Sequence, residues 1–239
     1  MTTGAGINTA EAEEWVAFLG NAIGGLHRAA LKLREQKADF ETKRDWFRKG
    51  GIPRENSVSQ ALKQLFDLIR AEQQVSGSGV QVVDLRHIRI ECELPRPFDP
   101  GISDEAKPTD LSIVLMKDNE LDFRIEAKTV LNDVGLKSEY LGPRGLQRFD
   151  DNSNPYTIQP FGGMVAYVVD ADANAWNAKI GSAIAVKLGS TRSGTRTIRG
   201  TAHHISRHHV RYRIDAKSVN RDVEVVHFAL EIDAKPPKR

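Results

Sequence analysis

The sequence predicts an α/β domain in which a central mixed sheet is flanked by helices. Two strand-like runs, 108–115 and 121–130, lie on either side of a polar turn at 117–120 and predict a hairpin. A helix is expected before them over 57–74, because the apolar residues of that segment recur at helical spacing. Further strand and helix patterns follow the hairpin, as in a sheet that is covered by helices.

The first 52 residues are expected to form an N-terminal helical region, and residues 53–239 the α/β domain. Residues 11–48 are compatible with helix, weakly interrupted at Gly24-Gly25. Two roles for their apolar side chains remain open. They could cover the core of the domain, or they could present an apolar face to a second protein or a second copy of the chain.

The remaining elements follow from local patterns. Glycine and proline divide 136–149 into short helical pieces, and 189–195 is predicted to be a flexible loop because it is rich in Gly, Ser and Thr. A helix is expected over 171–188. Four further strands are expected, at 87–94, 162–169, 203–214 and 223–232.

Three side chains near the hairpin indicate chemistry. Asp110 opens the first run, and Glu126 and Lys128 end the second on one face, because residues two apart in a strand point the same way. Two carboxylates suit a hard divalent cation such as Mg²⁺. Bound metal lowers the pKa of a water molecule, and a neighbouring ammonium can orient that water. The combination is typical of phosphodiester hydrolysis.

At these residues the chain resembles the PD-(D/E)xK nuclease superfamily, whose motif reads here as Pro108-Thr109-Asp110 followed by Glu126-Ala127-Lys128. One extra residue separates Pro108 from Asp110. The resemblance implies a restriction-endonuclease-like core. It also implies that Asp110, Glu126 and the Ala127 carbonyl bind Mg²⁺ or Mn²⁺, and that Lys128 positions the attacking water. The alternative is that these charged residues form an ordinary solvated strand end.

Glu55 precedes the expected helix, and two interpretations of it remain open. In many members of the superfamily an acidic residue on the first core helix completes the metal site. A carboxylate at this position would also complement the positive end of the helix dipole.

Basic residues cluster in one segment in a pattern that favours contact with nucleic acid. Residues 187–213 contain seven Lys or Arg and no Asp or Glu, although the net charge of the chain is only +2. On period two, one face of the last part of this segment carries Arg207, His209, Arg211 and Arg213. Arginine suits phosphate contacts, but the stripe could also be a solubilising outer face.

The resemblance adds further phosphate-contacting candidates after the second strand: Lys137, Arg144 and Arg148, together with Gln147. The adjacent histidines at 203–204 and 208–209 do not suggest zinc, because neighbours on a strand point to opposite faces. They are expected at the surface or on phosphate. His227 is expected to pack within the sheet.

Composition limits the class of protein. Forty per cent of the residues are hydrophobic, and no apolar run approaches the ~20 residues that a membrane span needs. Cys92 is the only cysteine, so an internal disulfide is excluded. The N-terminus lacks the pattern of a signal peptide, and a cytoplasmic protein is expected.

Together these observations predict a metal-dependent nuclease, and its resemblance to the superfamily implies DNA rather than RNA as the substrate. Its apolar N-terminal region and the absence of a recognisable specificity domain suggest that the chain works within a larger system. It is expected to be the effector subunit of a prokaryotic defence system, with a protein partner or a second copy bound through the N-terminal helices. The alternative is a nucleic-acid-binding or scaffolding subunit that does not cleave.

Overall fold

The computed structural model describes residues 8–41, 46–48, 51–76, 83–92, 110–116, 121–150, 156–169, 171–214 and 217–232, except for the side chains of residues 37 and 212–219. Several features predicted from the sequence lie outside this part of the chain. They are Pro108, Thr109, the hairpin turn at 117–120 and the side chain of Arg213.

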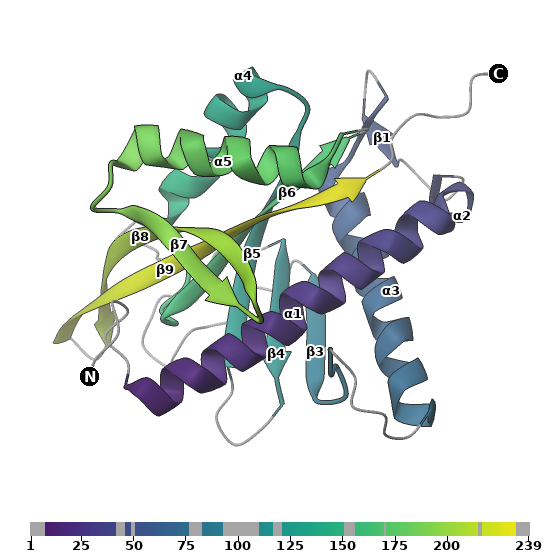
Figure 1. Ribbon diagram of the computed structural model, residues 1–239, viewed down its shortest axis with the longest axis horizontal. Coiled ribbons are helices and arrows are strands. Elements are labelled where there is room, and N and C mark those ends of the chain that lie inside the picture. Colours follow the sequence, from purple (N-terminus) through teal and green to yellow (C-terminus); the bar gives the residue numbers. More distant parts are fainter. Residues whose placement is uncertain are drawn as a thin grey trace.

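A seven-stranded mixed sheet forms the centre of the molecule, in the order β3-β4-β5-β6-β9-β8-β7 (Figure 1). The pairs β5–β6 and β6–β9 are parallel, and the other four neighbouring pairs are antiparallel. The predicted mixed α/β class is therefore confirmed. The strands are β3 (Ile88–Cys92), β4 (Leu111–Leu115), β5 (Leu121–Val130), β6 (Phe161–Val169), β7 (Ser193–Ile198), β8 (Thr201–Ile214) and β9 (Lys217–Ile232).

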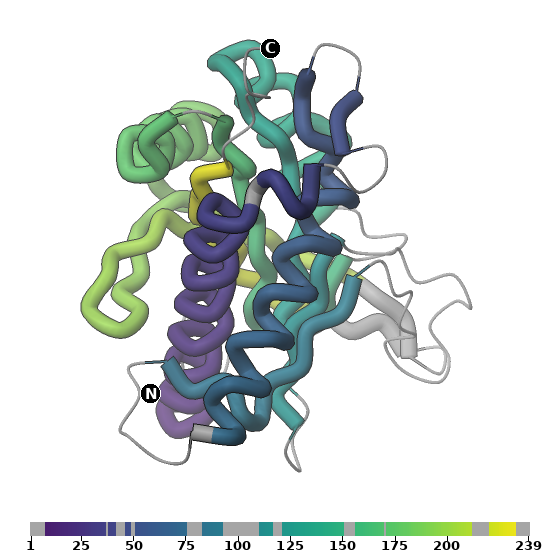
Figure 2. Tube along the Cα trace, turned by 90° about the vertical axis from the view of Figure 1, so that its right-hand side faces the viewer, coloured from purple at the N-terminus to yellow at the C-terminus, as the bar shows by residue number. Residues whose placement is uncertain are grey.

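Helical segments cover both faces of this sheet. The long helices α1 (Thr9–Glu35) and α3 (Glu55–Ser76) pack side by side on one face (Figure 2) and share a core with it. The second core lies under α5 (Ala173–Leu188) and the short helical segments α4, η1 and η2. Their bounds are Asp133–Gly135 for α4, Leu136–Tyr140 for η1 and Leu146–Asp150 for η2.

The N-terminal helix α1 packs on the body of the domain. It continues through Gly24-Gly25, and most of its apolar side chains, though not Leu31, are buried in the same core as those of α3 and the sheet. A Cβ on Gly25 would lie 2.4 Å from the Phe66 ring of α3, so this close approach requires glycine. Of the two roles left open by the sequence, covering the core is the one that the structure shows.

A short helix and a small hairpin connect α1 to α3. Helix α2 spans Lys37–Glu41, and strands β1 (Phe47–Arg48) and β2 (Ile52–Pro53) pair antiparallel. The hairpin turns at Gly51, which has a φ of 72°, a conformation that glycine adopts without strain.

Several sequence-based boundaries were wrong. Phe47–Arg48, at the end of the predicted helical run 11–48, form strand β1, and β9 begins at Lys217 rather than at 223. Helix α3 begins at Glu55 rather than Ser57, so Glu55 lies in its first turn. The end of the predicted flexible loop at 189–195 belongs to β7, where pairing with β8 overrides the low strand propensity of Ser193 and Gly194. Among the described helices none has the length and apolar character needed to cross a bilayer.

Candidate active site

Asp110 lies immediately before β4 and contacts the backbone of β5. Leu111 pairs with Ile125 in the antiparallel register, which places Asp110 next to the second half of β5. Its Oδ2 atom accepts a hydrogen bond from the amide nitrogen of Ala127 at 2.7 Å. The pairing of the two strands therefore brings Asp110 to the Glu126–Lys128 segment, although these residues are distant in sequence.

Glu126 and Lys128 form an ion pair on one face of β5. The Lys128 Nζ atom lies 2.7 Å from Glu126 Oε1 and 3.0 Å from the Ala127 carbonyl oxygen. Only 2% of Glu126 and 8% of Lys128 is exposed. Because an isolated buried charge is costly, each of these side chains requires the other or an equivalent partner.

Glu55 reaches the same cluster from the first turn of α3. Its Oε1 atom accepts a hydrogen bond from the Thr129 amide nitrogen at 2.9 Å, and its Oε2 atom lies 3.6 Å from Lys128 Nζ. The carboxylate therefore contacts β5 directly, beyond any effect on the helix dipole. Three carboxylates, those of Asp110, Glu126 and Glu55, surround the end of this strand.

Two further side chains, Arg148 and Tyr156, contact Glu126. Arg148 of η2 donates from Nη1 to Glu126 Oε1 at 3.0 Å, and the Tyr156 hydroxyl donates to Glu126 Oε2. The Arg148 guanidinium also lies over the Tyr156 ring, 4.5 Å from its centroid. The sequence predicted Arg148 as a phosphate contact, whereas no local pattern marked Tyr156.

The charges of this cluster change its protonation behaviour. Burial, followed by the negative charge of Glu126, raises the pKa of Asp110 from 3.8 to about 7, although the Lys128 ammonium opposes the shift. Burial lowers the pKa of Lys128, but the three carboxylates outweigh it and raise that pKa above its ordinary value. Lys128 is therefore an ammonium at neutral pH.

The oxygen atoms of this cluster have the chemistry that Mg²⁺ or Mn²⁺ requires. The carboxylates of Asp110, Glu126 and Glu55 and the carbonyl of Ala127 are hard donors. The Lys128 ammonium, itself a cation, lies among them and contacts two of the expected ligands, Glu126 Oε1 and Ala127 O. Within the described residues no group of three or more His, Cys, Asp or Glu side chains is arranged to hold a metal. In this structure the oxygen atoms that could bind a metal instead surround the Lys128 ammonium.

On β8 the basic side chains of the predicted stripe alternate with more buried ones, over the residues whose side chains the structure describes. Arg207, His209 and Arg211 are at least partly exposed, while His208 and Val210 are buried. The neighbouring strand β9, however, supplies acids that the segment itself lacks. Glu224 lies 3.5 Å from Arg207, and Asp222 lies 2.8 Å from His209.

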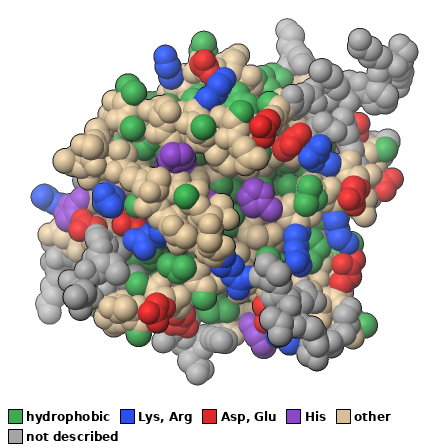
Figure 3. Space-filling view, in the orientation of Figure 1, with side chains coloured by type: hydrophobic (Ala, Val, Ile, Leu, Met, Phe, Trp, Pro, Cys, Tyr) green, Lys and Arg blue, Asp and Glu red, His purple; other side chains and the backbone are tan. Residues whose placement is uncertain are grey.

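The other basic candidates lie apart from this stripe. Lys137 is on η1 and lines a groove against α5, and Arg144 is exposed in the turn before η2. On the face seen in Figure 3, Lys and Arg side chains alternate with Asp and Glu. Within the described part of the chain, Arg148 is the basic candidate that contacts Glu126.

A hydrogen-bond chain runs beside this site from the exposed Asp150 through the buried residues His208, Ser206 and His227 to Tyr140. The successive distances are 3.0, 2.8, 2.8 and 3.0 Å. His227 packs within the sheet as predicted, but the surface position expected for His208 was wrong, because Asp150 and Ser206 satisfy both of its ring nitrogens. The Asp–His–Ser order is that of a serine hydrolase triad. Ser206 is fully buried, however, and cannot meet a substrate.

Comparison with known proteins found no matching family model, no matching curated protein and no matching solved structure. The functional argument therefore starts from the geometry of Asp110, Glu126 and Lys128.

Proposed function

We propose that this chain is a metal-dependent nuclease with a restriction-endonuclease-like core that hydrolyses phosphodiester bonds of DNA, as the effector subunit of a prokaryotic defence system. One observation carries the catalytic part of the proposal. The Lys128 ammonium lies between the Glu126 carboxylate and the Ala127 carbonyl, beside an Asp110 that is anchored on the Ala127 amide.

The order of elements supports the same proposal. Helix α3, which carries Glu55, precedes the antiparallel strands β3, β4 and β5, and short helical segments then lead to the parallel strand β6. This order agrees with the one predicted from the sequence, in which a helix precedes two paired strands and further helical and strand segments follow them. The choice of DNA is supported by the resemblance to the nuclease superfamily, which is an argument by analogy. The defence role is supported by the apolar composition of the N-terminal region, from which a partner is expected.

Each residue of the cluster has a role in the proposed reaction. Asp110, Glu126 and the Ala127 carbonyl would hold Mg²⁺ or Mn²⁺, which when bound lowers the pKa of a water and offsets charge on phosphate. Lys128 is protonated, so it orients a water or a phosphate oxygen as a donor and does not act as the base. Glu55 lies 3.6 Å from Lys128 Nζ and helps to keep it charged.

The hydrogen bonds and ion pairs that Glu126 makes within the chain favour a second function. Lys128 and Arg148 both bind its Oε1 atom, and Tyr156 binds Oε2. A carboxylate neutralised within the chain would suit a subunit that binds nucleic acid without cleaving it. Such a subunit would show salt-sensitive affinity that EDTA does not change.

Cleavage of supercoiled plasmid, linear duplex, single-stranded DNA and RNA in Mg²⁺ or Mn²⁺ tests the proposal. We expect DNA cleavage by the wild type and a loss of at least ~100-fold in Lys128→Ala and Glu126→Gln, because both changes remove groups that act on the reacting phosphate. The fold of each variant is checked by circular dichroism and thermal unfolding. Lys63→Ala is a matched control, because Lys63 pairs with Asp67 on α3 and lies outside the cluster.

Metal-dependent cleavage that survives in both variants would contradict the proposed site. Binding without cleavage, unaffected by EDTA and also by Lys128→Ala, would support the non-cleaving function. If RNA alone is cut and both variants are inactive, the site stands and the proposed substrate is wrong.

A further inference from the structure

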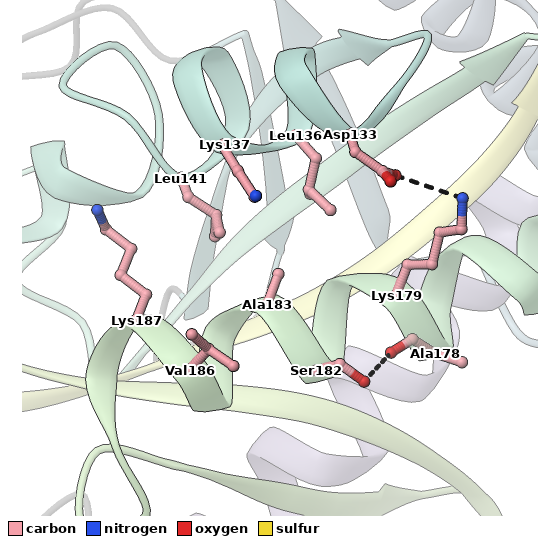
Figure 4. A pocket seen from close by; sticks show the side chains of 10 residues that line it. All are labelled: Asp133, Leu136, Lys137, Leu141, Ala178, Lys179, Ser182, Ala183, Val186 and Lys187. Carbon is pink, nitrogen blue, oxygen red and sulfur yellow. Dashed lines mark hydrogen bonds and ion pairs between the residues drawn. The ribbon is translucent and has the colours of Figure 1, made fainter.

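A groove separates α5 from the α4–η1 segment. Its volume is about 660 Å³. Figure 4 shows side chains from both walls pointing toward one another across it. The lining residues are Asp133, Leu136, Lys137 and Leu141 on one side and Ala178, Lys179, Ser182, Ala183, Val186 and Lys187 on the other.

Aliphatic side chains form the floor and one rim. Leu136 and Leu141 are 3% exposed and continue into the core, whereas Val186 on α5 is 88% exposed. Between them α5 presents small side chains, among them Ala183, which leave room for another backbone to approach. An exposed apolar surface next to a cavity is typical of an interaction site.

Lysines surround this apolar floor. Lys137 approaches from η1, and Lys179 and Lys187 approach from α5 (Figure 4). Asp133 is the single acid in the lining, and its ion pair with Lys179 at 3.3 Å is exposed, with little energetic weight. The rim is therefore positively charged.

We propose that this groove binds an amphipathic helix of a partner protein that carries acidic residues beside its apolar stripe. Two helical walls, an aliphatic floor and a charged rim are the features of helix-in-groove recognition. Acidic side chains on the flanks of the helix complement the lysines. Nucleic acid fits less well, because its phosphates would contact the lysines but leave the aliphatic side chains of Leu136, Leu141 and Val186 without an apolar partner, and the lining includes no aromatic ring on which an unpaired base could stack.

This surface differs from the one that the sequence suggested for a partner. Most apolar side chains of α1 are buried against α3 and the sheet, although Leu31 is 56% exposed. Val186, by contrast, is 88% exposed. The inference does not depend on the proposed nuclease activity, since none of the groove residues belongs to the Asp110–Glu126–Lys128 cluster.

The test uses the full chain and a fluorescent synthetic helix of about 18 residues, with Leu at i, i+3, i+4 and i+7 and Glu beside that stripe. Fluorescence anisotropy measures its affinity. We expect saturable binding that weakens roughly fivefold or more in both Val186→Ser and Lys187→Ala, since the first removes apolar contact and the second removes charge. Val75→Ser is the matched control, because Val75 is also 88% exposed but lies on α3. It should bind as the wild type does.

A second peptide with Lys in place of Glu should bind at least ~10-fold more weakly, because the rim would then repel it. Absence of saturable binding would overturn the proposal, as would equal loss in Val186→Ser and Val75→Ser. Displacement of the acidic peptide by duplex DNA would also overturn it and would assign the lysines to nucleic acid.

Discussion

Glu126 is the residue on which the candidate site depends. Its two carboxylate oxygens are bound by Lys128, Arg148 and Tyr156, which come from three different parts of the chain. A metal ion at Glu126 would have to compete with these donors, above all with the two cations on Oε1. The local sequence could predict the partnership with Lys128, because the two residues lie on one face of a strand. It could not predict the contact of Tyr156, which is 30 residues away.

Asp110 gives a prediction about stability and pH. Its folded pKa of about 7 lies above the ordinary value of 3.8, so between these values the folded state binds more protons than the unfolded state. The free energy of unfolding then falls as the pH rises from about 4 to 7. In EDTA, we expect the free energy of unfolding of Asp110→Asn to lack the decrease that the Asp110 carboxyl causes between about pH 4 and 7. At about 1.4 kcal/mol per pKa unit, the upper limit of the difference is roughly 4 kcal/mol.

Urea unfolding of the wild type and Asp110→Asn at pH 4, 6 and 8 measures this difference. Asp67→Asn is the control, because Asp67 pairs with Lys63 and Arg70 on the surface of α3. A constant difference between the wild type and Asp110→Asn across the three pH values would contradict the raised pKa.

At the scale of elements, η2 joins the candidate site to the far strands of the sheet. Arg148 of this short helix binds Glu126 on β5. Two residues later, Asp150 lies 2.7 Å from Arg192 and 3.0 Å from His208 on β8. The contacts of Asp150 with Arg192 and His208 therefore help to hold η2, and with it Arg148, beside Glu126. The sequence indicated short helical pieces here but gave no sign of what they would bridge.

Two tyrosines on opposite faces of the sheet allow a paired prediction. Tyr156 donates to Glu126, and the Tyr167 hydroxyl lies 2.8 Å from Ser59 Oγ on the α3 face. Both are fully buried, so removing either hydroxyl should cost about 1–3 kcal/mol of stability. Only Tyr156→Phe should also change Mn²⁺ affinity, since it alters the donors around Glu126.

Thermal unfolding and calorimetric titration with Mn²⁺ measure the two effects separately. Equal Mn²⁺ affinities in Tyr156→Phe and the wild type, together with the expected loss of stability, would make Tyr156 a purely structural residue. A changed affinity in Tyr167→Phe would show instead that the effect spreads through the fold.

For the whole molecule, local patterns predicted most strands and helices, because their apolar residues recur at period two or near 3.6. Strand β5 was predicted over its full length, 121–130, and β9 was recognised but begins six residues earlier than expected. Strand β7 was missed because Ser193 and Gly194 gain their structure from pairing with β8. The order of strands, and hence the acids that β9 places beside the basic stripe of β8, depends on contacts between distant segments that periodicity does not encode.

Metal binding should stabilise the whole fold if the cluster holds an ion. A ligand that binds only the folded state adds about 2.7 kcal/mol at one hundred times its Kd, which would raise the unfolding temperature by several degrees. We expect Mg²⁺ or Mn²⁺ to raise the wild-type unfolding temperature in a saturable and EDTA-reversible way. Glu126→Gln should remove the rise, because an amide is a far weaker ligand for these hard cations than a carboxylate.

Asp222→Asn is the control for that measurement, since Asp222 pairs with His209 on the exposed stripe and is not among the expected ligands. An equal rise in the wild type and Glu126→Gln would place the metal elsewhere on the protein. If neither metal shifts unfolding but duplex DNA does, with the shift lost at high salt, the chain is better described as the non-cleaving subunit. This measurement needs no turnover, so it can separate the two functions even when the isolated chain is inactive.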